Sequence, residues 1–359
     1  MPGTHMEMQV NPSRHIIDMP SSCSSIRSTR RVSRLVLGAM LVRTLRPGDG
    51  TPVERDWLER LRCDDIVLLD GGTGSELQRR GVAMSPVAWS GLASRQHRTA
   101  LRDVHADFIR AGADIITTNT FGTTRFVLEV AGCGEEFEII NNAAVEAALE
   151  ARQIAADRPV AIAGSISCLP PRFDDAAYPS ARTERSAYEE LAQLLAQLGV
   201  DLIALEMIQD LEHGRLAMEA ALATGLPVCL GVSARQLDAA LVCFDYLDRD
   251  FGAVVDSLIA LGPAVVNVMH TPPDDIGVAL EAVQRQWRGP LGTYPELGDF
   301  AAPDWQFTDA VSPEDLADLA VGWVGQGVRL LGGCCGTGPE HIAALAQARP
   351  RLLEARAVR

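Results

Sequence analysis

Short apolar runs rich in isoleucine, valine and leucine recur along the chain from residue 65 onward. Each run is continuously apolar and does not alternate with polar positions, which is typical of parallel strands buried on both faces. The pattern therefore predicts eight strands, at residues 65–70, 114–118, 160–165, 201–206, 228–233, 264–270, 290–294 and 328–333.

Amphipathic stretches with helical spacing separate these runs and follow the last one. They predict helices at residues 97–111, 142–156, 186–198, 211–223, 254–261, 276–287, 313–326 and 339–348. Parallel strands joined by helices form a right-handed α/β architecture. Eight such units match the (β/α)8 TIM barrel, which usually has about 250 residues. We predict this barrel, with an open doubly wound sheet as the alternative, because the pattern does not encode strand order.

Composition restricts the partners and the compartment. The 359 residues are 47% hydrophobic, and 32 basic against 47 acidic side chains give a net charge of −15. This balance disfavours nucleic acid as a partner, and no apolar run approaches the roughly 18 residues that indicate a membrane span. Eight cysteines scattered over a chain of this size indicate reduced thiols in a cytoplasmic protein. The oligomeric state is not encoded in these features.

Residues 1–48 differ from the rest of the chain. No acidic side chain occurs between positions 19 and 48, where arginine and serine are frequent. We expect a disordered extension, or a start codon assigned too early, before one barrel domain over residues 49–359. A targeting segment is the alternative for such a start.

Two adjacent cysteines, Cys334 and Cys335, stand between glycines directly after the eighth predicted strand. Active sites of such barrels lie at the carboxyl ends of the strands, and the glycines permit a tight turn there. Two thiolates could enter one tetrahedral zinc site, with room for a further protein ligand and a substrate. The alternatives are small core residues and a strained vicinal disulfide with a redox role.

The first and fourth predicted strands also end in carboxylates. Asp70 begins an Asp-Gly-Gly-Thr-Gly turn, but Leu77 stands where a dinucleotide-binding loop would need its third glycine. We interpret Asp70, Gly71 and Gly72 as a turn that presents a carboxylate and free amides to an amino-acid ligand; an ordinary loop is the alternative. Glu206 ends a buried run, where a carboxylate needs a partner, either a substrate ammonium group or a neighbouring arginine.

Together these segments resemble the homocysteine S-methyltransferase family over about residues 60–348. The matching segments are 69–77, 118–121, Glu206, 294–295 and 332–337, of which the double-cysteine motif is the most specific. The resemblance implies a zinc-dependent (β/α)8 barrel that moves a methyl group to the sulfur of homocysteine. Zinc deprotonates a coordinated thiol, and the thiolate attacks the methyl group in line.

The resemblance also implies a role for each matching residue. The ligands of Zn²⁺ would be Cys334 and Cys335. The residues that hold the amino-acid end of homocysteine would be Asp70, Gly71, Gly72 and Glu206. The catalytic residues near the sulfur and the methyl donor would be Asn119 and Tyr294.

The sequence departs from the family at the sixth strand, where the family has a third zinc cysteine directly after an asparagine. Here Val268 follows Asn267, and valine cannot bind a metal. His270 would point to the same side as position 268 if the strand persists, because side chains alternate along a strand. We therefore hypothesise a zinc site of His270, Cys334 and Cys335 with a fourth position for substrate. The alternative is a weakened or metal-free pocket in which His270 is a general base or a polar wall.

The methyl donor is expected to be a small molecule. No folate- or cobalamin-binding module and no long extension of the betaine-using kind follows the eighth unit, so we expect a stand-alone barrel that uses S-methylmethionine or S-adenosylmethionine. Glu296, where the family more often has asparagine, could favour a cationic donor, but we prefer to interpret it as a solvent-facing loop charge. The alternatives are a transferase acting on another thiol, a selenol or an amine, and a non-catalytic binding barrel with a decayed metal site.

Overall fold

A computed structural model describes residues 56–308 and 311–356 of the chain. The extension predicted for residues 1–48 lies outside the described residues. The described residues belong to one compact unit, Val53–Arg359. No helix among them combines the length and the apolar character that a membrane crossing requires.

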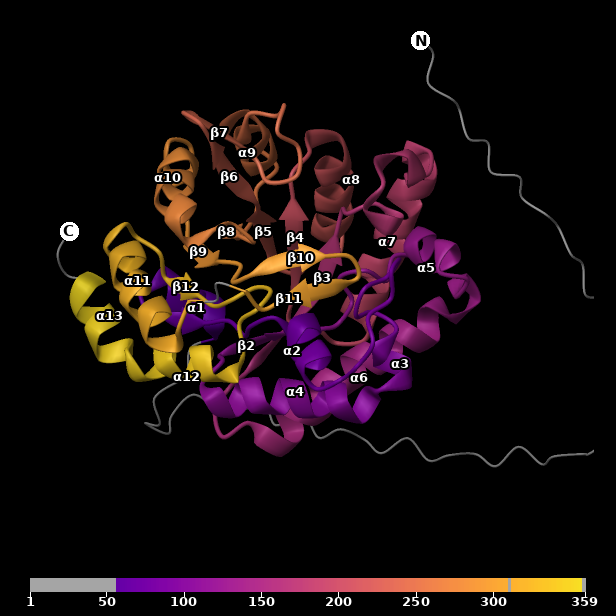
Figure 1. Cartoon of the computed structure of the whole chain (residues 1–359), viewed down its shortest axis with the longest axis horizontal. Coiled ribbons are helices and arrows are strands. Elements are labelled where there is room, and N and C mark those ends of the chain that lie inside the picture. Colours follow the sequence, from indigo (N-terminus) through magenta and orange to yellow (C-terminus); the bar gives the residue numbers. More distant parts are fainter. Residues whose placement is uncertain (1–55, 309–310, 357–359) are drawn as a thin grey trace, which may run out of the picture. The chain divides into compact units, whose positions relative to one another are not determined.

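Eight parallel strands form the centre of the fold (Figure 1). In chain order they are β1 (Val67–Leu68), β2 (Ile115–Thr117), β3 (Ala161–Ser167), β4 (Leu202–Ile208), β5 (Val228–Val232), β8 (Val265–Met269), β9 (Leu291–Tyr294) and β12 (Leu330–Leu331). They pair in the order β1-β12-β9-β8-β5-β4-β3-β2, and a parallel bridge between Leu69 and Ile115 joins the first and last strands of this series. The sheet closes at this seam, which confirms the predicted (β/α)8 barrel and excludes the open sheet.

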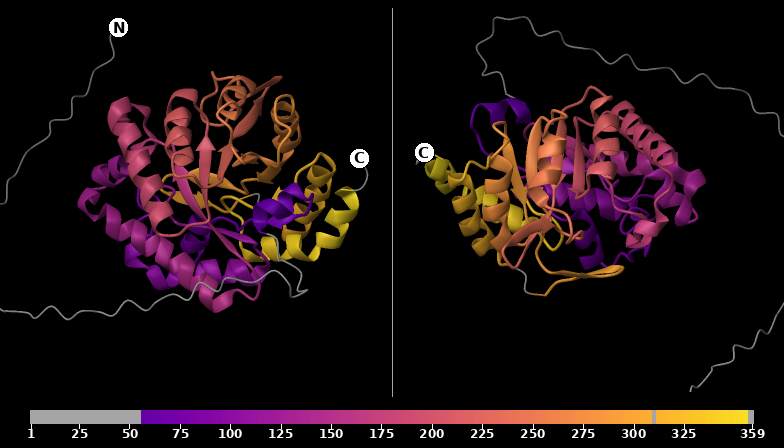
Figure 2. Two further views of the ribbon diagram at one scale, coloured as in Figure 1. Left: turned by 180° about the vertical axis from the view of Figure 1, so that it is seen from behind. Right: turned by 90° about the horizontal axis from the view of Figure 1, so that it is seen from above.

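Helices pack around the strands, most of them on the outside of the barrel (Figure 2). In chain order they are α1 (Trp57–Arg62), α2 (Thr73–Arg79), α3 (Ala93–Gln96), α4 (Arg98–Ala111), α5 (Arg125–Val130), α6 (Phe137–Ala155), α7 (Ala181–Gln197), α8 (Leu211–Leu222), α9 (Phe251–Ile259), α10 (Pro273–Gln284), α11 (Pro313–Gly325), α12 (Pro339–Gln347) and α13 (Arg349–Arg356). Three short 3₁₀ turns are η1 (Gly134–Glu136), η2 (Pro171–Phe173) and η3 (Asp175–Ala177). All eight predicted helices are present, and α6 and α7 begin about five residues earlier than predicted.

Side chains of each strand alternate between two apolar layers. Inside the barrel, Val265 and Met269 of β8 pack in one cluster with Leu330 of β12. On the outer surface, Val266 and Val268 of the same strand belong to the cluster that the helices share. The two layers explain why the strands are continuously apolar in sequence.

Two β-hairpins that the pattern did not predict follow barrel strands at their carboxyl ends. One consists of β6 (Ala234–Leu237) and β7 (Ala240–Cys243), and the other of β10 (Asp299–Ala301) and β11 (Asp304–Gln306). Gln78 of α2 holds the second hairpin, because its side chain donates to the Trp305 carbonyl at 2.8 Å and accepts the Trp305 N–H at 2.7 Å. The hairpins therefore extend the carboxyl-terminal end of the barrel.

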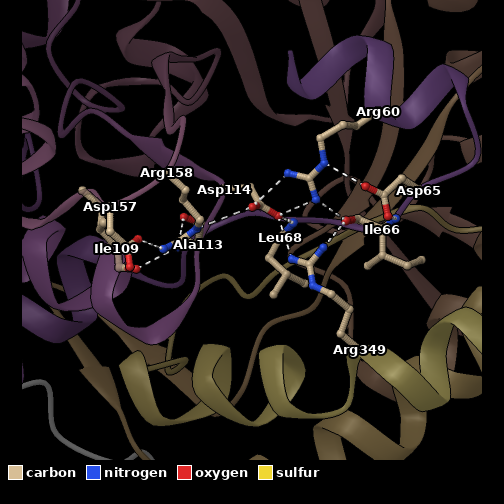
Figure 3. A network of polar contacts seen from close by, with 10 residues as sticks. All are labelled: Arg60, Asp65, Ile66, Leu68, Ile109, Ala113, Asp114, Asp157, Arg158 and Arg349. Carbon is tan, nitrogen blue, oxygen red and sulfur yellow. Dashed lines mark hydrogen bonds and ion pairs between the residues drawn. The ribbon is translucent and has the colours of Figure 1, made fainter. Parts of the chain in front are cut away.

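An ionic network occupies the opposite, amino-terminal end of the barrel (Figure 3). The Asp114 carboxylate accepts the Leu68 N–H at 2.9 Å and the Arg349 guanidinium at 2.9 Å, and it lies 3.0 Å from Arg60 Nη1. Burial alone would raise the pKa of Asp114, but the two arginines outweigh burial and hold the pKa below its usual value. The network joins β1, β2, α1 and α13 at the seam where the barrel closes.

Candidate active site

The carboxyl ends of the strands surround one pocket, as expected for a (β/α)8 barrel. Every candidate residue named from the sequence lines this pocket: Asp70, Gly71, Gly72, Asn119, Glu206, His270, Tyr294, Cys334 and Cys335. Aromatic side chains from loops and from the β10–β11 hairpin complete the wall: Trp89, Phe121, Phe244, Phe300 and Trp305. Phe121 belongs to segment 118–121, which the sequence analysis had singled out. The sequence contained no signal for the other four, because they stand in loops or in a hairpin that the apolar pattern did not predict.

Cys334 and Cys335 lie on the turn between β12 and α12. Backbone hydrogen bonds from Cys334 N–H to the Pro295 carbonyl (2.9 Å) and from Leu297 N–H to the Cys335 carbonyl (2.8 Å) attach this turn to the segment after β9. Gly336 has a φ of +82°, and a Cβ atom there would lie 1.7 Å from the Leu297 carbonyl oxygen. Only glycine fits this position, so the flanking glycine allows the tight turn that presents both sulfurs.

His270 reaches the pocket through a backbone conformation that non-glycine residues rarely adopt. Strand β8 ends at Met269, and His270 has a φ of +43°. Val268 packs with the outer helices, so continued strand alternation would have turned position 270 toward the helices as well, away from the pocket. The reason given from the sequence was therefore wrong. The left-handed turn at His270, and not the pleat of the strand, brings its imidazole to the cysteines.

Three potential metal ligands meet at one wall of the pocket. His270 Nδ1 lies 3.4 Å from Cys334 Sγ, and the sulfurs of Cys334 and Cys335 lie 3.9 Å apart. All three ligand atoms lie within 4.8 Å of one another. Tetrahedral bonds to one zinc ion place neighbouring nitrogen and sulfur ligands about 3.5–3.8 Å apart. The arrangement is thus close to that of a shared ion, and both cysteines are free thiols.

The other ring nitrogen of His270 contacts Glu296. His270 Nε2 lies 3.1 Å from Glu296 Oε2, and the Glu296 side chain is only 11% exposed. The interpretation of Glu296 as a solvent-facing loop charge was therefore wrong. Burial alone would lower the pKa of His270, but Cys334 and Glu296 outweigh burial and raise the pKa to about 9. Edge contacts with Phe244 and Trp305, at ring-centroid distances of 4.9 and 5.9 Å, enclose the imidazole.

Two carboxylates, Asp70, which is buried, and Glu206, which is partly buried, stand at other strands of the pocket. Asp70 accepts the Thr117 N–H at 2.7 Å and the Thr117 hydroxyl at 2.9 Å, and burial raises the pKa of Asp70 well above its usual value. Glu206 accepts the Ser165 hydroxyl. Burial raises the pKa of Glu206 to about 7, although hydrogen bonds from Ser165 and Tyr294 oppose the shift. No arginine among the described residues forms an ion pair with either carboxylate, so both are suited to a cationic ligand.

Two of the nominated groups already have partners in the protein. The Gly72 N–H donates to the Thr337 carbonyl at 3.0 Å, so this amide is not free for a ligand, contrary to the expectation. The Asn119 amide donates to the Ser90 carbonyl (2.8 Å) and to the Ser94 hydroxyl (3.0 Å), and its oxygen accepts the Ser90 hydroxyl at 2.7 Å. Asn119 thus holds the loop before α3 while it lines the pocket, and its catalytic role stays a prediction.

Two donors that the sequence analysis missed also line the pocket. The Thr73 hydroxyl and the Trp89 indole N–H are buried and have no hydrogen-bond partner among the described residues. Thr73 stands within the turn that begins at Asp70, so it was within reach of the sequence argument, whereas Trp89 had no local signal. Buried donors without partners are costly, which makes both suitable contacts for the oxygen atoms of a ligand.

Comparisons with known proteins identify the family of the chain. The profile of a family described as homocysteine S-methyltransferase matches residues 67–349. Betaine–homocysteine S-methyltransferase 1 from Bos taurus is 28% identical over 331 residues, which are 84% of this chain and 76% of that protein. Homocysteine S-methyltransferase 2 from Zea mays is 26% identical over 83% of this chain and 93% of its own length. Selenocysteine methyltransferase from Astragalus bisulcatus is 25% identical over 81% of this chain and 94% of its own length.

A solved structure has the same fold. The metallated form of the homocysteine methyltransferase MmuM from Escherichia coli superposes with a TM-score of 0.66 and 23% identity, covering 81% of this chain and 99% of the other. The family profile extends over all eight strands and includes His270 and both pocket cysteines. The chain therefore belongs to the homocysteine S-methyltransferase family, whose members are methyltransferases.

Proposed function

We propose that the protein transfers a methyl group from a sulfonium donor, S-methylmethionine or S-adenosylmethionine, to the thiol of homocysteine and so forms methionine. The observation that carries this proposal is the meeting of His270, Cys334 and Cys335 within 4.8 Å at the wall of a pocket. Family membership supports the type of chemistry, and the pocket supports the substrate class.

The side chains at this wall fit a zinc ion. Two thiols and an imidazole are ligands that zinc prefers, and separations of 3.4 and 3.9 Å suit a single tetrahedral ion. His270, Cys334 and Cys335 would hold the ion and leave one position for the substrate. Zinc bound there would lower the pKa of a substrate thiol, which then reacts as the more nucleophilic thiolate.

The amino-acid end of homocysteine fits the part of the pocket that Asp70 and Glu206 line. Its ammonium group would pair with the carboxylates of Asp70 and Glu206, which have no arginine partner among the described residues. Its carboxylate would accept hydrogen bonds from the unpaired donors of Thr73 and Trp89. With its ammonium group and its carboxylate both held, homocysteine would direct its sulfur toward the metal-binding wall. Such positioning lowers the entropic cost of the reaction.

A sulfonium donor suits the aromatic part of the pocket. Trp89, Phe121 and Trp305 line the pocket, and the electron-rich faces of aromatic rings attract a cation. In the transfer, the methyl–sulfur bond of the donor breaks with its electrons left on the donor sulfur, while the substrate sulfur forms the new bond. The thiol proton leaves to solvent, so charge balances without a redox cofactor. Asn119 and Tyr294 would line this space and orient the donor.

A second acceptor deserves the same test. One relative is named selenocysteine methyltransferase, and a selenol would occupy the position of the homocysteine thiol. The size of the pocket beyond Asp70 and Glu206 would then select between a shorter and a longer amino acid.

We also propose a cytoplasmic location and a role in methionine biosynthesis. Each cysteine that the structure describes is a free thiol, which supports a reducing compartment. The acidic net charge of −15 supports small molecules, and neither nucleic acid nor membrane lipid, as partners.

The decisive experiment uses the full chain, purified without chelator. Zinc content is measured by mass spectrometry, and methionine formation is measured with homocysteine and, separately, S-methylmethionine, S-adenosylmethionine or betaine. Cys334→Ala is the test variant, and Cys63→Ala, at an exposed cysteine remote in the sequence, is the matched control. We expect about one zinc per chain and methionine from a sulfonium donor, both lost in Cys334→Ala and retained in Cys63→Ala.

Three outcomes would contradict the proposal in different ways. Betaine as the only productive donor would overturn the sulfonium assignment alone. Methylation of selenocysteine but not of homocysteine would replace the acceptor. Zinc-free protein that forms no methionine with any donor would leave a binding barrel as the better description.

A further inference from the structure

The two ring nitrogens of His270 have different partners. Nδ1 faces Cys334 Sγ at 3.4 Å, whereas Nε2 faces Glu296 Oε2 at 3.1 Å. A histidine that binds a metal does so as the neutral imidazole, which presents a lone pair on one nitrogen while the other carries the proton. The carboxylate can only accept from Nε2–H, so the free lone pair lies on Nδ1, the nitrogen beside the cysteines.

The backbone holds this arrangement together. The His270 N–H donates to the Tyr294 carbonyl at 3.1 Å, and the Glu296 N–H donates to the Thr271 carbonyl at 3.4 Å. The Glu296 side chain is 11% exposed and His270 is 8% exposed, so water competes little for their contact. The segment that carries Glu296 is therefore attached to the segment that carries the imidazole, independently of the side-chain pair.

We infer that Glu296 is a positioning residue for the metal site: it binds Nε2–H of His270 and thereby directs Nδ1 toward an ion shared with Cys334 and Cys335. This inference rests on the proposed function. Carboxylates that accept the remote N–H of a metal-binding histidine fix its tautomer and orientation and increase its basicity as a ligand.

Charge gives Glu296 a second effect. The resemblance implies three cysteine ligands in the family, which bring three negative charges as thiolates. Two thiolates and one neutral imidazole bring only two. The Glu296 carboxylate, one hydrogen bond behind the imidazole, restores the third negative charge next to the ion. Histidine and glutamate together thus replace the missing cysteine, which explains why the chain has both departures from the family pattern.

Zinc affinity tests the inference without a turnover assay. Competition with a chromophoric chelator would compare the wild type with Glu296→Ala and Glu296→Gln, and Asp299→Asn would control for loss of a nearby exposed acidic charge. We expect Glu296→Ala to lower zinc affinity about tenfold to hundredfold. Glu296→Gln should lose less, because its amide oxygen still accepts Nε2–H but carries no charge. Asp299→Asn should bind zinc like the wild type.

The same comparison in a His270→Cys background tests whether Glu296 acts through the imidazole of His270. With a third thiolate there is no imidazole to orient and the third negative charge is already present, so Glu296→Ala should lower zinc affinity much less than it does beside His270. Cobalt absorption in the single variants provides an independent readout that does not require His270→Cys to fold. Glu296→Ala should shift the d–d bands, because the nitrogen ligand is reoriented, while thiolate-to-cobalt charge transfer persists.

The outcomes separate this inference from the function on which it rests. Zinc bound equally well by the wild type and by Glu296→Ala overturns the role of Glu296 alone. A loss of affinity of the same size with histidine or with cysteine at position 270 overturns it as well, because Glu296 would then act only through general charge. Absence of zinc binding in the wild type overturns both the proposed function and this inference.

Discussion

His270 Nδ1 lies 3.4 Å from the sulfur of Cys334, although 64 positions separate the two residues in the chain. The contact joins the end of the sixth barrel strand to the turn after the eighth, across the strand between them. This distance is shorter than the 3.9 Å between the sulfurs of Cys334 and Cys335. The metal proposal depends on this contact, because it brings the imidazole to the two thiols.

Replacing His270 tests this contact directly. His270→Ala leaves two thiols and removes the nitrogen ligand, so zinc affinity should fall at least hundredfold, and methionine formation should fall with it. Chelator competition and zinc analysis after dialysis measure the affinity. Because the variant also leaves Glu296 without its partner, the melting temperature of the metal-free protein is measured beside the affinity, and wild type and variant are compared at a temperature at which both are folded. Stoichiometric zinc that survives dialysis in His270→Ala would exclude histidine as a ligand.

Glu206 should make amino-acid binding depend on pH. Burial raises its pKa to about 7, and only the ionised carboxylate pairs strongly with an ammonium group. Methionine, which has no titrating thiol, is a suitable probe, and its affinity should rise about tenfold between pH 6 and pH 8. Calorimetry on the wild type and on Glu206→Gln measures this. The variant should bind more weakly at pH 8, and its affinity should be nearly flat with pH.

The same carboxylate should affect the stability of the ligand-free protein. Its folded-state pKa of about 7 exceeds the ordinary value of 4.5, so the folded chain binds this proton more tightly than the unfolded chain. The stabilising contribution is complete below about pH 4.5 and disappears as the pH rises through 7. Chemical denaturation at pH 5 and pH 8 should show a smaller difference for Glu206→Gln than for the wild type. If the stability difference between pH 5 and pH 8 is the same in Glu206→Gln as in the wild type, a group other than Glu206 binds the proton.

His105 should make the protein sensitive to acid. The side chain is buried in α4, neither ring nitrogen has a partner among the described residues, and burial lowers the pKa of His105 to about 4. The folded state therefore favours the neutral ring, and this contribution to stability is present above pH 6.5 and is lost as the pH falls toward 4. The loss amounts to about 2 kcal/mol at pH 5. Denaturant titration of His105→Leu should show that this part of the acid sensitivity is gone.

Asp114 should be important for closing the barrel. Asp114→Asn keeps the shape of the side chain but removes the charge that faces Arg60 and Arg349, and it should lower the free energy of unfolding by about 2–3 kcal/mol at pH 7. The pKa of Asp114 lies below its usual value, so its stabilising contribution is present above about pH 4 and declines below it. Wild type and variant should therefore converge in stability at low pH. A variant as stable as the wild type at pH 7 would show that the network is replaceable.

Much of the fold could be predicted from the apolar pattern, because every barrel strand is buried on two faces and therefore reads as an uninterrupted apolar run. The two hairpins could not be predicted in this way. Their strands are three or four residues long and largely exposed, so they have neither an apolar run nor a regular alternation. Their contribution to the pocket, including Trp305, was missed for the same reason.

The candidate residues could be named from the sequence because the barrel collects the carboxyl ends of its strands at one place, whatever the details of each loop. Their partners could not be named. The Gly72 amide is occupied by Thr337, and the Asn119 amide by Ser90 and Ser94. These partners come from other segments of the chain. The residue type alone does not indicate whether a group binds a substrate or a neighbouring residue.

The sequence by itself determined the barrel, the double-cysteine turn and the absence of a cysteine at position 268, since these follow from composition and spacing along the chain. Only the tertiary structure decided which side chain lies beside the two sulfurs. Val268 faces the helices, and a φ of +43° turns His270 toward the sulfurs and against Glu296. The physical reason is that one residue in the left-handed conformation changes the face to which its side chain points. Such a conformation depends on the packing of segments that are distant in sequence.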